Sequence, residues 1–135
     1  MIAGVRGFVY GFVESLGMGR SFYFEGRALK DSAEPVSRAE LEIGEVYYRV
    51  SFFDRDMTTP EISTLVFIGF DLKKEGEGKI YFQDSMSYIS GFRYGDTDKD
   101  NPAIIFARTE NQLNGLYNFT TALEILMCCS LRKKN

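Results

Sequence analysis

Carboxylates are the most numerous side chains of this chain that can transfer a proton or bind a metal ion. The sequence has 135 residues and no histidine, whereas Asp and Glu together number 19. Histidine is the one side chain whose unperturbed pKa lies near neutral pH, and it is the commonest metal ligand. Its absence excludes Ser-His-Asp and Cys-His triads and histidine-based metal sites. We therefore expect a protein that is not an enzyme and that has no metal or other cofactor.

The carboxylates themselves do not form a recognisable catalytic or metal-binding pattern. The densest group consists of Asp96, Asp98 and Asp100. Alternate aspartates begin an EF-hand calcium loop, but that loop needs Gly at position 6 and Glu at position 12, where this chain has Asn101 and Ala107. Paired carboxylates act in glycosidases, yet no spacing here selects a pair. We interpret residues 96–102 as a charged turn, and Asp54-Arg55-Asp56 as another.

Among the residues of this sequence, the aromatic ones indicate a binding function most strongly. The chain has 12 Phe and 8 Tyr, and they recur on nearly every predicted strand. Core packing explains most of them, but Tyr47 and Tyr81 fall on strand faces that the alternation assigns to solvent. Exposed tyrosines are typical of recognition surfaces. Alternatively, aromatic rings on a curved sheet enclose an apolar ligand.

Strands are predicted where apolar residues alternate or run continuously. Residues 45–53 indicate a strand with one face toward solvent, formed by Glu45, Tyr47, Arg49 and Ser51. Residues 62–72 are apolar on both faces, as in a central strand. Residues 79–89 and 103–107 are predicted as two further strands. Short connections between them favour an antiparallel meander.

The sequence predicts the secondary structure of the C-terminal end of the chain more clearly than that of the N-terminal end. Residues 2–16 fit either a helix or a strand, and residues 7–14 with 21–27 fit a hairpin. At the other end, Thr121 and Glu124 match a capping box that begins a C-terminal helix. Thr109 and Gln112 match a second capping box, which begins a separate short turn. The adjacent Cys128 and Cys129 are interpreted as small apolar helix residues. The sequence thus predicts one α+β domain over residues 1–135: a single antiparallel sheet of five or six strands with the C-terminal helix packed on one face.

Charge and hydropathy limit the kinds of partner. The formal net charge is −3 and the pI is about 5.0, which disfavours nucleic acid. No apolar run reaches the roughly 18 residues that span a membrane, and residues 1–16 lack the features of an export signal, so we expect a cytoplasmic protein without a membrane partner.

The sequence therefore predicts a non-enzymatic, small acidic protein that binds a basic protein partner. By analogy of class only, such proteins include immunity proteins that neutralise a basic toxin domain. One alternative is a carrier of a small apolar ligand in a cavity of the curved sheet. A third reading is a histidine-free enzyme that uses a carboxylate or a tyrosine. The predicted partner-binding residues are Tyr47, Tyr81, Asp54, Asp56, Asp96, Asp98 and Asp100. The oligomeric state is not predicted.

Overall fold

The structure is a computed structural model that describes residues 20–23, 26, 28–30, 32–73, 78–97 and 100–134. The two interpretations of residues 2–16, and the predicted strand at 7–14, lie outside these residues. Of the predicted strand at 21–27, residues 21–23 and 26 are described, and they are not in a strand.

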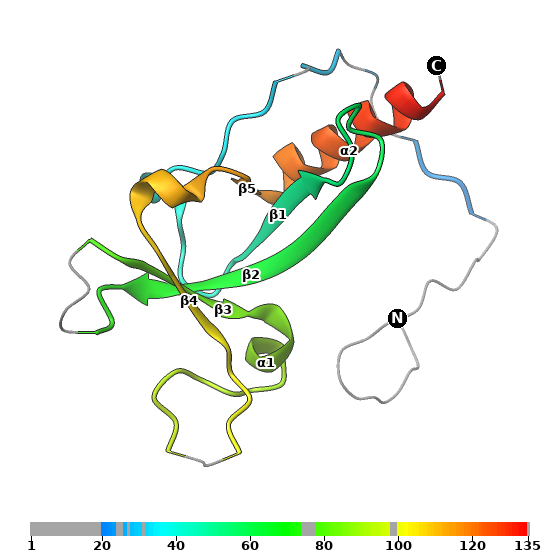
Figure 1. The fold of residues 1–135 in the computed structure, drawn as a ribbon. Helices are drawn as coiled ribbons and strands as arrows, with labels where there is room; N and C mark the ends of the chain where they lie inside the picture. Colours follow the sequence, from blue (N-terminus) through cyan, green and yellow to red (C-terminus); the bar gives the residue numbers. More distant parts are fainter. Residues whose placement is uncertain are drawn as a thin grey trace.

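The described residues form one antiparallel sheet of five strands with a long C-terminal helix (Figure 1). In chain order the elements are the 3-10 helix η1 (Arg38–Glu40), β1 (Val46–Phe52), β2 (Pro60–Phe70), β3 (Ile80–Asp84), α1 (Ser85–Ile89), β4 (Ile105–Arg108), the 3-10 helix η2 (Glu110–Leu113), β5 (Leu116–Tyr117) and α2 (Phe119–Lys133). The strand order is β4-β3-β2-β1-β5, so the first four strands form a meander and β5 returns to the free edge of β1. The predicted α+β class, with an antiparallel sheet and a C-terminal helix, is confirmed.

Strand β2 is the centre of the sheet, as its continuous apolar sequence predicts. Leu65, Val66 and Phe67 are consecutive and all buried, so both faces of the strand are covered. The pairing with β3 shifts between Phe67 and Gly69, where Gly69 has φ +144° and an added Cβ would lie 3.1 Å from Leu72 Cδ2. This irregularity lies near the C-terminal end of β2.

The main hydrophobic core covers one face of the sheet. Its members come from four strands, from the chain before β1 and from η2: they are Val36, Leu41, Tyr47, Leu65, Phe67, Ile80, Phe82, Leu113 and Leu116. Cross-strand pairing sets Tyr47 opposite Leu65 and Phe67 opposite Phe82. The chain before β1 and the short helix η2 therefore cover this face, and no long helix among the described residues does.

The predicted exposure of the two tyrosines is wrong. Tyr47 is 4% exposed and Tyr81 is 3% exposed. Alternation along β1 does persist, because Arg49 and Ser51 on the same face are exposed, but Val36 and Leu41 cover that face at Tyr47. Tyr81 is buried because β3 is an inner strand, where its cross-strand partners are Gly69 and Ala107.

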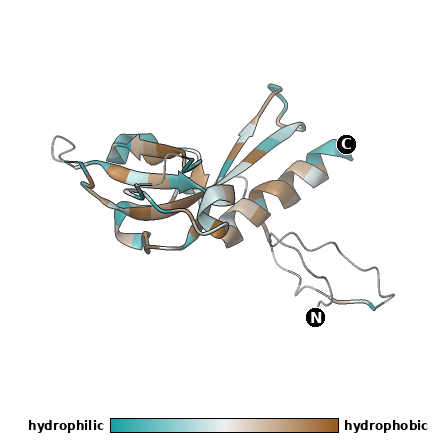
Figure 2. Cartoon of the chain, turned by 90° about the horizontal axis from the view of Figure 1, so that it is seen from below, coloured by the Kyte–Doolittle hydropathy of each residue, from teal (hydrophilic) through white to brown (hydrophobic). Residues whose placement is uncertain are grey.

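Helix α2 packs against β1 and β5 on the opposite face of the sheet. Its buried residues are Ala122 and Cys129, and the ring of Phe119 meets that of Tyr48 edge-on with 5.7 Å between centroids. Figure 2 shows α2 alongside the strands, with hydrophobic residues along the helix and hydrophilic ones at its C-terminal end. The burial of Cys129 agrees with the prediction of a small apolar residue.

Helix α2 begins two residues before the predicted capping box. Its N-cap is Asn118, whose side-chain Oδ1 accepts a hydrogen bond from the Thr121 N–H at 2.8 Å. Thr121 therefore lies inside the first turn of the helix, where its own side chain is not needed as a cap. The capping box predicted at Thr109 and Gln112 is confirmed. Thr109 is the N-cap of η2, and its N–H donates to Gln112 Oε1 at 2.9 Å.

We expect Asn118→Ala to lower the free energy of unfolding by about 1 kcal/mol, because one N–H of the first turn loses its acceptor. Thr121→Ala is the control, since the sequence pattern places the cap there and the structure does not. Urea unfolding of both variants measures the difference. If Thr121→Ala proved the more destabilising of the two, the helix would begin where the sequence pattern puts it.

The predicted strand at 79–89 ends at Asp84, and residues 85–89 form α1 instead. Asp84 accounts for the change because it is the N-cap of α1: its Oδ2 accepts from the Ser87 N–H at 3.0 Å, and its Oδ1 accepts from the Ser87 hydroxyl. Oδ1 also accepts from the Ile104 N–H at 2.9 Å. One carboxylate thus ends β3, starts α1 and holds the chain just before β4.

These hydrogen bonds give Asp84 a pH-dependent role in stability. Burial acts to raise the pKa of Asp84, but the hydrogen bonds from Ser87 and Ile104 outweigh it and leave the pKa below its usual value. Since the pKa is lower in the folded state than in the unfolded state, the ionised group stabilises the fold above the unfolded-state pKa. That stabilisation is lost as the pH falls through the folded-state pKa.

We therefore expect Asp84→Asn to lower the free energy of unfolding at neutral pH and to reduce its further decline toward about pH 3. Urea unfolding over this pH range measures both effects. Asp56→Asn, at an exposed position, is the control and should follow the unmodified protein throughout. An undiminished acid decline in Asp84→Asn would refute the role given to Asp84.

Candidate functional site

The best candidate for a functional site is a groove beside the N-terminal end of α2, which we call the acidic groove. Its lining residues come from the chain before β1, from β1 and from the start of α2: they are Val36, Glu40, Glu42, Glu45, Val46, Tyr47, Asn118, Phe119 and Thr120. Its volume is about 390 Å³. All three glutamates are exposed to solvent.

A short turn positions the three glutamates. Glu40 ends η1, and its Oε1 accepts a hydrogen bond from the Ser37 N–H at 2.8 Å. Gly44 has φ +90°, a value that residues with a Cβ rarely adopt, and it lets the chain turn into β1 directly before Glu45. The sequence E-L-E-I-G-E at 40–45 thus projects Glu40, Glu42 and Glu45 around one turn.

Tyr47 supports this turn from inside the core. Its hydroxyl accepts a hydrogen bond from the Glu42 N–H at 2.9 Å and donates to the Glu40 carbonyl at 3.2 Å. Tyr47 therefore belongs to the site as a support, although the exposed binding role predicted for it is wrong.

The local electrostatics show that the groove carries concentrated negative charge. Burial raises the pKa of Tyr47, and the neighbouring carboxylates of Glu42, Glu45 and Glu40 add to that rise. Hydrogen bonding to the Ser37 backbone, and then to its side chain, lowers the pKa of Glu40 and keeps it ionised. Within the part of the chain that the structure describes, neither Glu42 nor Glu45 has a basic side chain as partner. Their charge is available to a ligand from outside.

An exposed aromatic ring completes the acidic groove. Phe119 is 63% exposed although it is the first residue of a helix that otherwise packs on the sheet. Its ring packs against the ring of Tyr48 at an interplanar angle of 60°. An exposed ring beside three carboxylates suits recognition of a cationic side chain, because the carboxylates accept its N–H donors and the ring face attracts its charge.

The structure does not bring the sequence-predicted site residues together. Tyr81 is buried in β3, and Asp98 lies outside the described residues. Asp54 and Asp56 lie in the turn between β1 and β2, whereas Asp96 and Asp100 lie in the connection between α1 and β4, at a different end of the molecule (Figure 1). Only Tyr47 lines the acidic groove.

One aspartate in each of the two turns has a local structural role, as expected of a charged turn. Asp54 accepts hydrogen bonds from the Thr58 N–H and hydroxyl and from the Thr59 N–H, and its hydrogen bond with the Thr58 side chain is the main cause that lowers its pKa. Asp96 accepts from the Arg93 N–H at 2.8 Å. The carboxylates of Asp54 and Asp96 are thus used within their own turns.

The turn that carries Asp54 and Asp56 also lies beside the basic end of α2. The Arg132 Nε donates to the Met57 carbonyl at 3.0 Å, and Arg132 with Lys133 lines a cleft with Thr58 and Thr59. These cations offset the acidic charge of the turn. A basic partner therefore has less to gain here than at the acidic groove.

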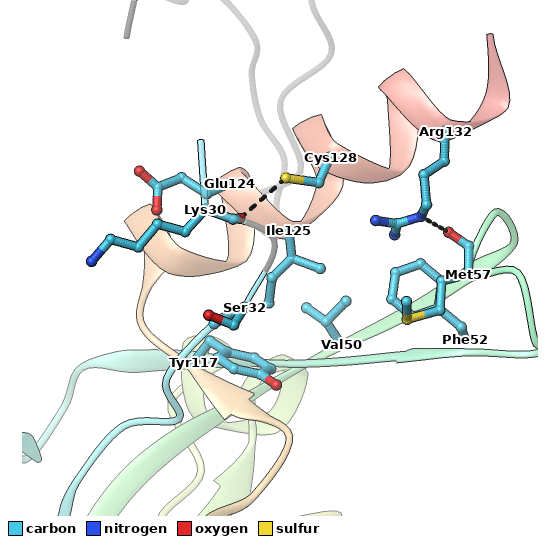
Figure 3. Close-up of a pocket in the computed structure, with 11 residues that line it drawn as sticks. Lys30, Ser32, Val50, Phe52, Met57, Tyr117, Glu124, Ile125, Cys128 and Arg132 are labelled. Carbon is cyan, nitrogen blue, oxygen red and sulfur yellow. Dashed lines mark hydrogen bonds between the residues drawn. The ribbon is translucent and has the colours of Figure 1, made fainter. Parts of the chain in front are cut away.

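Another groove, of about 250 Å³, separates α2 from β1 and the chain near residue 30 (Figure 3). Its lining includes the positively charged Lys30 and Arg132 and the negatively charged Glu124. The Cys128 thiol donates a hydrogen bond to the Lys30 carbonyl at 3.4 Å. This contact within the groove holds α2 against the chain near residue 30. We interpret this groove as structural.

Sequence reasoning missed Glu40, Glu42, Glu45 and Phe119 as a group. The available signal was the presence of three glutamates within six residues directly before a strand. Phe119 gave no such signal, because its exposure and its place beside residues 40–45 follow from the packing of α2.

The described residues contain neither a cluster suited to a metal ion nor a helix suited to a membrane. No group of three or more Asp, Glu or Cys side chains there is arranged to hold a metal ion. No described helix combines the length and the apolar character needed to cross a lipid bilayer.

Comparison with known proteins gave no relative: no protein-family model, no curated protein and no solved structure matches this chain.

Proposed function

We propose that this protein is a non-enzymatic, cytoplasmic binding protein that holds a basic protein partner in the acidic groove. The observation that carries the proposal is the presence of three exposed glutamates and one exposed phenylalanine around a single hollow. Neutralisation of a basic toxin domain, as by an immunity protein, is the use that this surface suits best.

The groove offers two kinds of contact to a partner. An Arg or Lys side chain that enters it meets the carboxylates of Glu42 and Glu45 while the Phe119 ring shields the contact from water. Aromatic rings are enriched among the residues that dominate binding energy at protein interfaces. The three glutamates also attract a basic partner over a distance and raise the association rate, an effect that falls as salt increases.

A photocrosslinking experiment tests the proposal. A benzophenone amino acid replaces Phe119 in the groove and, in a control, replaces Met86, which is 70% exposed on α1. In lysate of the source cell, the Phe119 probe should crosslink one protein of high pI, and excess unlabelled protein should compete it away. The Met86 probe should not capture that protein.

Salt provides the second arm of the experiment. Crosslinking through Phe119 should decline steeply between about 50 and 500 mM NaCl, because the attraction is largely electrostatic. Capture of an acidic partner, or capture that both probe positions share, would contradict the proposal.

A further inference from the structure

A further groove beside α1 is lined by apolar and aromatic side chains together with Gln83 and Arg93. It is lined by Ile43, Ile68, Leu72, Gln83, Tyr88, Arg93 and Tyr94, and its volume is about 290 Å³. Ile43, Leu72 and Tyr94 form an exposed rim. We call it the Gln83 groove.

Gln83 is an unusual residue for this position, because it is 0% exposed on an inner strand. Its Nε2 donates two hydrogen bonds, to the Ser87 Oγ at 2.9 Å and to the Phe92 carbonyl at 2.9 Å. Its Oε1 has no hydrogen-bond partner among the described residues. A buried acceptor without a donor is unfavourable and is rare in native proteins.

The hydrogen bonds fix which way the Gln83 amide points. The Phe92 carbonyl only accepts, so the group that faces it must be the NH₂. The Ser87 hydroxyl gives its proton to the Asp84 carboxylate and therefore accepts from Gln83. Turning the amide over would place two oxygen acceptors against each other at Phe92. The unpartnered atom is therefore the oxygen, and what it lacks is a donor.

We propose that the Gln83 groove binds a small molecule with a flat apolar body and one N–H or O–H donor, which donates to Gln83 Oε1. The body lies against the rim of Ile43, Leu72 and Tyr94. The volume is close to the lower end of the range of small-ligand sites, about 300 Å³. A groove of this size, with one unpaired buried acceptor in its lining, suits a small molecule.

Arg93 forms one wall of this groove. Its guanidinium lies 3.7 Å from the centroid of the Tyr88 ring, and its NH1 donates to the carbonyls of Tyr88 and Phe92 at 2.7 and 2.8 Å. Phe92 is also the residue whose carbonyl holds the Gln83 amide. Phe92 thus links the Arg93 side chain to the Gln83 amide.

A pair of matched probes tests the donor requirement. Indole has an apolar bicyclic body and one N–H, and 1-methylindole has the same body without the donor. In an NMR titration, indole should shift the side-chain amide signals of Gln83 in a saturable manner. We expect 1-methylindole to bind about tenfold more weakly, because it leaves the buried acceptor unpaired.

A pair of matched variants tests the location. Ile43 is 72% exposed and Ile62 is 47% exposed, so neither serine substitution disturbs the core. Ile43→Ser should weaken indole binding several-fold by removing one side of the rim, whereas Ile62→Ser, outside the groove, should leave it unchanged. Equal affinity for the two probes would overturn the proposal, as would titration to the solubility limit without saturable shifts at Gln83, the result expected if only water occupies the groove.

Discussion

Reversing two charges in the acidic groove, with Glu42→Lys and Glu45→Lys together, is expected to weaken binding of the basic partner by about a hundredfold. The substitutions remove two attractive contacts and replace them with like-charge repulsion, which costs several kcal/mol at interfaces. Both side chains are exposed, so the fold should not change. Titration calorimetry with the captured partner at low salt measures the affinity.

The control for this variant carries the same change in net charge on another surface. Asp56→Lys with Glu61→Lys places the new lysines at exposed positions of the β1–β2 hairpin. We expect this control to bind the partner within a few-fold of the unmodified protein. If both double variants lost affinity equally, total charge rather than the acidic groove would govern binding.

Removing the ring at the centre of the main core, with Phe82→Ala, is expected to lower the free energy of unfolding by about 3–5 kcal/mol. Phe82 is fully buried, and its ring centroid lies 5.8 Å from that of Phe67. Domains of this kind have a total stability of about 5–15 kcal/mol, so the loss is a large share of it. Urea unfolding followed by circular dichroism measures it.

Met86→Ala is the companion to this variant, because Met86 lies on α1 and is largely exposed. Its effect should stay within about 0.5 kcal/mol. A loss below about 1 kcal/mol for Phe82→Ala would mean that the face closed by Val36, Leu41 and Leu113 is not the main core.

The sheet was predictable because its signals are local to the sequence. The unbroken apolar run of Leu65, Val66 and Phe67 marked a strand covered on both faces, and short connections marked the meander. The end of β3 was missed because alternation alone does not show that the Asp84 side chain will cap a helix with the Ser87 N–H. The start of α2 was missed for a similar reason, since Asn118 and Thr121 both favour the N-cap position.

The acidic groove was less predictable because it depends on contacts between distant parts of the chain. Alternation along β1 assigned Tyr47 to the solvent, and only the folding of Val36 and Leu41 over that face buries it. Likewise, Glu42 and Phe119 are far apart in the sequence and line one hollow because α2 follows β5, which pairs with β1. Aspartates in turns were the more visible acidic signal, but the side chains of Asp54 and Asp96 hold the turns themselves.

The most direct test of the central claim, that the acidic groove holds a basic protein, is NMR shift mapping of the complex with the captured partner. We predict that the largest amide shifts fall on Glu40, Glu42, Glu45 and Phe119 and that they fade as salt is added. Shifts centred instead on Asp54, Asp56 and Asp96, with the groove residues unchanged, would contradict the claim.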